Sequence, residues 1–256
     1  MGEQILFSSI YKDLINSKKK LKFFIDLRFF DIFKRSFGDQ EFIDKSNFKK
    51  IDEAIKNGFK FLYAGNLGKF YRNKISNFDG KPFYKVNEDK VKKYKSILSK
   101  YSFDKFIGIS WKSKRSKFVG KKSLELNNLK ELIDEPNIGF INLQYGEISD
   151  LQKYNSLNKK KIIQIDNLDL FSEIDDVISL IYNLDLVITT PNLNTHLAGS
   201  IGKKCISLFD IGYEDIMNSI ANDGKNEWYQ NLKILQVDDN LEDKVKEIKK
   251  DFINFF

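Results

Sequence analysis

The segment Val187-Ile-Thr-Thr-Pro-Asn-Leu-Asn-Thr-His-Leu-Ala-Gly199 decides the fold class of this sequence. It begins with an apolar run typical of a buried strand and ends with small residues that let a helix approach a sheet closely. Two hydroxyl residues, a proline and two asparagines lie between these parts, and Asn192 or Asn194 can serve as the N-cap of the helix. A strand that leads directly into a capped helix is half of a β-α-β unit, which predicts a parallel sheet.

The same alternation of short apolar runs and amphipathic stretches continues on both sides of this segment. It predicts strands at residues 22–26, 41–43, 59–63, 106–111, 139–144, 161–165, 185–190, 205–209 and 232–237. It predicts helices at residues 5–16, 29–37, 51–57, 90–101, 126–133, 175–183, 194–201 and 242–252. The chain is therefore predicted to be an α/β protein with parallel sheets covered by helices.

The predicted strands divide unequally along the chain. The half beginning near Phe106 carries a full Rossmann-like unit, whereas the first half is smaller and begins with a helix where a strand would be expected. We therefore expect two Rossmann-like domains, at residues 1–103 and 104–256, with the N-terminal one lacking its first strand. A sheet that lacks a strand exposes an edge or an apolar gap.

Composition excludes several classes of protein. The chain has 256 residues, of which 41% are hydrophobic, enough for a core, and no apolar run approaches the roughly 20 residues of a membrane-spanning helix. One cysteine, Cys205, excludes a disulfide framework, and with one histidine it also excludes a zinc finger. The N-terminus lacks the basic region and apolar core of a signal peptide, so we expect a cytoplasmic protein.

The net charge of +7 does not indicate a nucleic-acid-binding protein. Only 4 of the 43 basic residues are arginine, the residue favoured for bidentate phosphate and base recognition. The charge is also uneven, since residues 85–122 carry 13 basic side chains against 3 acidic ones. We therefore expect a local anion site and no nucleic-acid partner.

The first candidate site follows the strand at residues 106–111. Ser110, Lys112 and Ser113 lie where the chain leaves this strand, and ligands of open parallel sheets bind beyond the carboxyl ends of the strands. Backbone N–H groups in such a turn, with a lysine as a point charge, suit a phosphate group. A solvated loop in a lysine-rich protein is the alternative interpretation.

The second candidate site is the start of the helix at residues 194–201. Its N–H groups and dipole would face the strand ends, where a diphosphate could bind. The dipole contributes only about 0.3–1 kcal/mol, so further donors such as Thr195 are needed. His196 lies in the first turn, and its alternative role is that of a capping or core histidine held by a backbone carbonyl.

Two further pairs of residues are weaker candidates for a functional role. Gln144 and Tyr145 follow the strand at residues 139–144 and could cover a base or ribose, or could form an ordinary β-to-α turn. Asp175 and Asp176 begin a predicted helix, where carboxylates are favoured, so we assign them to capping.

Taken together, the chain resembles the GT-B glycosyltransferases. The segments concerned are Ile107-Gly-Ile-Ser-Trp-Lys-Ser, Phe140-Ile-Asn-Leu-Gln-Tyr-Gly and Thr195-His-Leu-Ala-Gly-Ser-Ile-Gly-Lys, with Gly2-Glu-Gln-Ile and Gly65-Asn-Leu-Gly-Lys-Phe-Tyr-Arg72 in the first half. They are similar to the bacterial heptosyltransferase-like enzymes often fused to tetratricopeptide repeats, which are relatives of the protein O-GlcNAc transferases. The resemblance implies two Rossmann-like domains facing a cleft, the C-terminal one binding a nucleotide sugar.

The resemblance also implies a mechanism. The donor diphosphate would bind against Ser110, Lys112 and the helix led by Asn194, Thr195 and His196, and Glu3 would be the general base for an acceptor hydroxyl. N–H donors and lysine would stabilise the leaving diphosphate, so no metal and no cofactor are expected. The partners implied are a nucleotide sugar and an acceptor glycan or protein, with the enzyme at most peripheral to a membrane. The alternative is a catalytically inactive GT-B-like module that binds a nucleotide or a protein, which the missing first strand favours.

Overall fold

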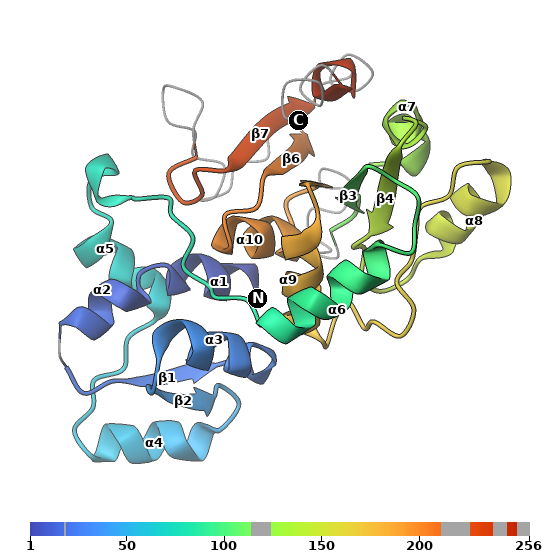
Figure 1. Ribbon diagram of the computed structural model, residues 1–256. Coiled ribbons are helices and arrows are strands. Elements are labelled where there is room, and N and C mark those ends of the chain that lie inside the picture. The colour runs from blue at the N-terminus through green and yellow to red at the C-terminus, as the bar shows by residue number, and fades with distance from the viewer. Residues whose placement is uncertain (18, 114–123, 211–225, 238–244, 250–256) are drawn as a thin grey trace.

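The fold is built on a five-stranded parallel sheet in the second half of the chain (Figure 1). This computed structural model describes residues 1–17, 19–113, 124–210, 226–237 and 245–249. The strand order is β4-β3-β5-β6-β7, and every neighbouring pair is parallel. The strands are β3 (Lys105–Ser110), β4 (Ile138–Asn142), β5 (Leu186–Thr189), β6 (Cys205–Asp210) and β7 (Leu232–Val237).

The two central strands are apolar on both faces because helices cover both. Alternate residues of a strand point to opposite faces. Ile107 and Ile109 of β3 accordingly lie in one hydrophobic cluster with Leu186 and Ile188, while Val187 lies in another. The helices of this half are α7 (Lys130–Ile133), α8 (Ser149–Leu157), α9 (Ile174–Asn183) and α10 (Leu193–Ser200), with a 3₁₀ helix at Leu126–Leu129.

The first half contains a smaller parallel sheet of two described strands, β1 (Lys22–Ile25) and β2 (Glu41–Asp44). Its helices are α1 (Gly2–Ser8), α2 (Tyr11–Asn16), α3 (Phe30–Phe37), α4 (Phe48–Lys56), α5 (Gly68–Tyr71) and α6 (Glu88–Leu98), with 3₁₀ helices at Leu27–Phe29, Ala64–Leu67 and Ile75–Asn77. The expected α/β architecture with two parallel sheets is thus confirmed. No helix in the described part of the chain is long and apolar enough to cross a membrane.

Several local predictions were wrong. The predicted strand at residues 161–165 is reduced to one bridge, between Ile163 and Ile141. The predicted helix at residues 5–16 is two helices, α1 and α2. Helix α8 was not predicted. Of the helix predicted at residues 242–252, residues 245–249 are helical and the others lie outside the described residues.

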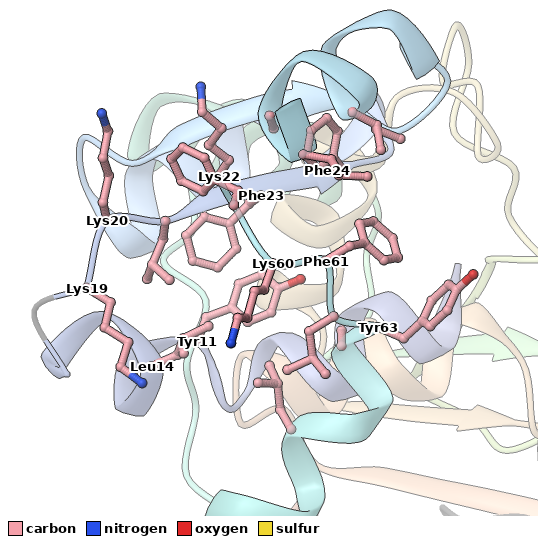
Figure 2. A pocket seen from close by; sticks show the side chains of 18 of the residues that line it. Tyr11, Leu14, Lys19, Lys20, Lys22, Phe23, Phe24, Lys60, Phe61 and Tyr63 are labelled. Atoms are coloured by element: carbon pink, nitrogen blue, oxygen red, sulfur yellow. The ribbon is translucent and has the colours of Figure 1, made fainter. Parts of the chain in front are cut away.

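Residues 59–63 form no strand, although their apolar composition predicts one. A cavity of about 840 Å³ separates this segment from β1, and both line it (Figure 2). A strand needs a neighbour to receive its backbone hydrogen bonds, and here the neighbouring position is vacant. The cavity lies beside β1, where the sequence predicts that the first strand of the smaller sheet is missing.

One hydrophobic core joins the two halves. It contains Ile5 and Leu6 of α1 and Phe33 of α3, together with Val177 of α9 and Leu197 of α10. All five side chains are at most 1% exposed. Since burying such a side chain stabilises a fold by about 1.5–3 kcal/mol, the two sheets are held together by a true core and not by a surface contact.

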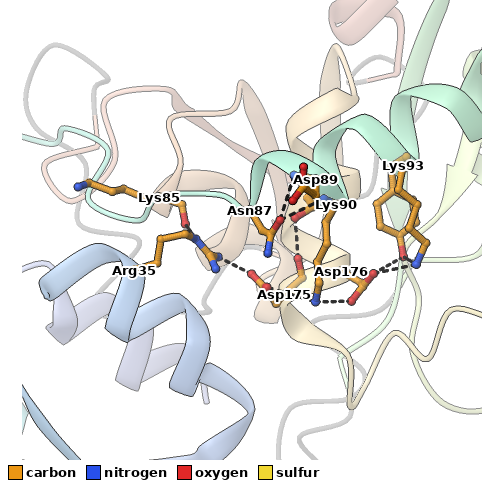
Figure 3. A network of polar contacts seen from close by, with 10 residues as sticks. Arg35, Lys85, Asn87, Asp89, Lys90, Lys93, Asp175 and Asp176 are labelled. Carbon is orange, nitrogen blue, oxygen red and sulfur yellow. Dashed lines mark hydrogen bonds and ion pairs between the residues drawn. The ribbon is translucent and has the colours of Figure 1, made fainter. Parts of the chain in front are cut away.

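A network of ion pairs reinforces the same junction (Figure 3). Asp176 of α9 accepts hydrogen bonds from Lys90 Nζ at 2.6 Å, Lys93 Nζ at 3.0 Å and the Tyr94 hydroxyl at 2.9 Å, all on α6. Asp175 pairs with Arg35 of α3 at 2.5 Å. These two carboxylates therefore tie α9 to α3 and α6, and their assignment to helix capping was wrong: neither serves as the N-cap, which is Glu173.

The pKa of Asp176 reflects this network. Burial acts to raise it, but hydrogen bonds from Lys90, Lys93 and Tyr94 outweigh burial and hold the pKa below its ordinary value.

Replacing Asp176→Asn should lower the free energy of unfolding at pH 7 by about 1–2 kcal/mol. A lowered folded-state pKa stabilises the protein above the unfolded pKa of about 3.9 and ceases to do so as pH falls through the folded pKa. The variant should thus lose less stability than the parent between pH 5 and pH 3, as urea titrations would measure.

The control for this substitution is Asp89→Asn on α6, whose side chain is 92% exposed. It should change stability by no more than about 0.5 kcal/mol. If the free energy of unfolding of Asp176→Asn fell as steeply between pH 5 and pH 3 as that of the parent, the stabilising role of the Asp176 carboxylate would be contradicted.

Candidate functional site

Polar side chains gather where β3, β4 and β5 end and α10 begins. The side-chain oxygen of Gln144 accepts hydrogen bonds from Ser110 Oγ at 3.2 Å, from the backbone N–H of Trp111 at 3.1 Å and from that of Lys112 at 2.8 Å. Three donors thus converge on one neutral oxygen. Ser110 is 1% exposed and Gln144 2% exposed, so this is a buried arrangement and not the solvated loop of the alternative interpretation.

Asn192, and not Asn194, caps α10. Its side-chain oxygen accepts from the backbone N–H of Asn194 at 2.8 Å and from that of Thr195 in a capping box. Its amide group donates to Ser110 Oγ at 2.8 Å and to the Lys112 carbonyl at 3.3 Å. The side chain of Asn192 therefore links the start of α10 to the end of β3, and an anion at this helix start would have to displace it.

Asn194 and Thr195 also contact the strand ends. The Asn194 amide donates to the Leu143 carbonyl at 2.8 Å, and the Thr195 hydroxyl donates to the Thr190 carbonyl at 3.2 Å. We use the term polar cluster for the buried side chains of Ser110, Gln144, Asn192, Asn194 and Thr195 together with the backbone of Lys112. The structure brings together Ser110, Lys112, Asn194 and Thr195, which the sequence analysis grouped at one site, and adds Gln144, which it had placed at a base or ribose.

The Lys112 side chain leaves this group and pairs with Asp150 Oδ2 at 2.6 Å. The same oxygen accepts from the indole N–H of Trp111 at 2.5 Å. Burial acts to raise the pKa of Asp150, and the contacts with Lys112 and Trp111 lower it on balance. Asp150 was not predicted, because nothing in the sequence indicates that the first turn of α8 contacts Lys112, which lies 38 positions earlier.

Ser113 is 8% exposed, and the residues that follow it, 114–123, lie outside the described residues. Its part in the site stays a prediction. The described residues contain no group of three or more histidine, cysteine, aspartate or glutamate side chains placed to hold a metal ion.

His196 lies at the contact between α10 and α1. Its Nδ1 is 3.0 Å from the Tyr229 hydroxyl, and a Cβ placed on Gly2 would lie 2.5 Å from its Cδ2 and 2.6 Å from its Nε2. Only a glycine fits at the start of α1 with the ring in this position. The structure thus holds the imidazole between Gly2 and Tyr229, with the Tyr229 hydroxyl as one partner of the ring.

Glu3 follows Gly2 in the first turn of α1 and is exposed. Helix α1 packs on α10. The Glu3 carboxylate therefore lies on α1, which contacts α10, the helix that begins at the polar cluster.

Tyr145 lies outside the polar cluster, against a second aromatic ring. Its ring centroid is 6.0 Å from that of Phe171, and the guanidinium of Arg28 lies 4.5 Å from the centre of the Phe171 ring. Burial raises the pKa of the Tyr145 hydroxyl. Arg28 comes from the first half of the chain, so this group of planar side chains spans the junction.

The polar cluster should depend on Gln144. Gln144→Ala removes the acceptor of three buried donors, which should lower the free energy of unfolding by about 1–3 kcal/mol in urea titrations. The matched control is Gln152→Ala on α8, an exposed position where the change should stay within about 0.5 kcal/mol. Equal stabilities of the two variants would show that the donors do not depend on this oxygen.

A solved structure that is similar to this chain identifies its fold. No family model matches the chain. A glycosyl transferase of family 9 from Veillonella parvula has a similar structure, with a TM-score of 0.64 over 97% of this chain and 88% of that one, at 12% sequence identity. The fold is GT-B. The ADP-heptose LPS heptosyltransferase II of E. coli is less similar, with a TM-score of 0.48 over 68% of this chain and 55% of that one, at 15% identity.

In sequence, the chain is 24% identical over 220 residues to the protein FlbA of Caulobacter vibrioides. The match covers 79% of this chain and 36% of FlbA, so the chain spans about a third of that protein's length. The likeness to the family 9 glycosyl transferase establishes the fold. The narrower resemblance to O-GlcNAc transferases and the domain boundary at residues 103 and 104 stay predictions.

Proposed function

We propose that the protein is a glycosyltransferase that transfers a sugar from a nucleotide diphosphate sugar to an acceptor hydroxyl. The observation that carries the proposal is the polar cluster, which lies at the carboxyl edge of a parallel sheet and at the start of α10. Ligands of open α/β sheets bind at this edge, and anions bind at helix starts. The GT-B fold adds support, since a family 9 glycosyl transferase shares it.

In this mechanism the second half binds the donor. The backbone N–H groups of Trp111 and Lys112 and the amide of Asn192 would turn from their present acceptors to the diphosphate oxygens. Lys112 would exchange Asp150 for the diphosphate and stabilise the charge that develops as the sugar leaves. These groups need no metal ion for that purpose.

The acceptor, a glycan or a protein, would approach from the first half. Glu3 would take the proton of its hydroxyl as the oxygen attacks the anomeric carbon. Tyr145, with Phe171 and Arg28 beside it, would cover the nucleotide base.

Donor binding tests the site. UDP- and ADP-sugars should bind with micromolar to millimolar affinity in calorimetric titrations, and Lys112→Ala should weaken binding about tenfold, or 1.4 kcal/mol. Lys153→Ala removes the same charge from an exposed position on α8 and should leave the affinity unchanged. If Lys112→Ala binds as tightly as the parent, the diphosphate lies elsewhere.

Turnover tests Glu3 separately. Glu3→Gln should keep the donor affinity and lower the release of nucleoside diphosphate about 10²- to 10⁴-fold, the usual contribution of a general base. Glu53→Gln, an exposed glutamate on α4, is the control and should keep full activity.

A binding module without catalysis is the second candidate. The polar cluster favours it in one respect, because the described donors are already satisfied by Gln144 and Asn192. Donor binding in the parent without any release of nucleoside diphosphate, to water or to glycan acceptors, would establish this alternative.

A further inference from the structure

The smaller sheet has an open edge at β1. Among the described residues, β1 pairs only with β2. The carbonyl of Ile25 accepts from Lys45 N–H at 2.8 Å on the β2 side, so the alternation of a strand turns the backbone groups of Lys22 and Phe24 to the opposite edge. Asp26, the next residue on that edge, donates its N–H to Gln4 Oε1 at 3.2 Å.

Residues 59–63 form the facing wall. Phe61 is 49% exposed, Leu62 48% and Tyr63 72%. Three consecutive large apolar side chains of this exposure make a patch of the kind that a partner covers. The backbone hydrogen bonds of this segment to described residues lie at its ends, from Phe59 N–H to Ala54 and from Asn66 N–H to the Tyr63 carbonyl.

The cavity between these walls is large enough to hold a strand. Helix α2 lines the cavity through Tyr11 and Leu14 (Figure 2). Helix α4 lines it through Ala54 and Ile55. A strand of five residues between two helical layers fills a slab of about 16 by 4.8 by 10 Å, or about 800 Å³. The cavity measures about 840 Å³.

The order of the elements indicates which strand belongs there. A Rossmann-like half sheet has the strand order 3-2-1-4. β1, β2 and residues 59–63 follow one another along the chain and correspond to positions 2, 3 and 4, so the position left open is that of the strand that precedes β1. The Gln4 contact with Asp26 places the first turn of α1 at the carboxyl end of β1, where a strand parallel to β1 would deliver the chain into this helix.

We propose that this cavity is the seat of a β-strand of about five apolar residues, parallel to β1, that leads into α1 from polypeptide ahead of Met1. A strand from a second copy of the chain would not continue into α1, whose first turn meets the end of β1 through Gln4 and Asp26. The buried side-chain nitrogen of Gln4, which has no hydrogen-bond partner among the described residues, lies in the turn that such a strand would enter. The proposal is independent of the glycosyltransferase function.

The test adds the strand. Val-Val-Ile-Val-Val placed directly ahead of Met1 should raise the melting temperature of the 256-residue chain by about 5 °C or more. It should also protect the Phe24 amide from hydrogen–deuterium exchange. A control extension with proline as its central residue cannot pair along its length and should do neither.

A matched pair of substitutions locates the added strand. Ile55→Asp places a carboxylate in the cavity at a side chain that is 50% exposed, so it should leave the 256-residue chain unchanged and abolish the gain from the extension. Phe48→Asp on the same helix, 72% exposed and outside the cavity, should preserve the gain.

Two results would overturn the proposal. One is equal melting temperatures and equal exchange for the valine-rich and proline-containing extensions. The other is a dimer of the 256-residue chain that Ile55→Asp dissociates, because a second copy would then cover the cavity.

Discussion

The hydrophobic core shared by the two halves is the constraint on which the remaining structure depends. Leu6 of α1 and Leu197 of α10 are fully buried in it, although they lie 191 positions apart in the sequence. Their burial brings Gly2 against the His196 ring and carries Glu3 to the helix that leads out of the polar cluster. The ion pairs of Asp175 and Asp176 add directional contacts at a junction that apolar packing already determines.

The polar cluster combines two properties that usually conflict. Buried polar groups must be hydrogen-bonded, and here Gln144 and Asn192 satisfy the described donors from within the protein. A binding site needs donors that a ligand can claim. The two demands are compatible if these side-chain amides exchange places with an anion, because each gives up hydrogen bonds that the ligand restores. Lys112 forms an ion pair with Asp150, and a diphosphate would take the place of Asp150 as its partner.

Among the described residues, the smaller sheet has an open edge at β1, and this edge affects the segment that faces it across the cavity. Residues 59–63 have the composition of a strand and yet form none, because backbone hydrogen bonds across a sheet require an adjacent chain. Their aromatic side chains remain exposed for the same reason. Sequence composition measures the preference of a segment, and only the neighbouring elements decide whether that preference is met.

The sequence by itself determined the alternation of strands and helices and the end of the sheet at which polar residues gather. Both follow from local periodicity and from the polar residues after β3, β4 and β5, where Ser110, Gln144 and Asn192 lie. Only the tertiary structure decided the partners: Asp150 for Lys112, Tyr229 for His196, and Arg35 and Lys90 for the two aspartates of α9. Such contacts join residues 33 to 140 positions apart, and a local pattern cannot encode which distant side chain packing will bring within reach of a charge.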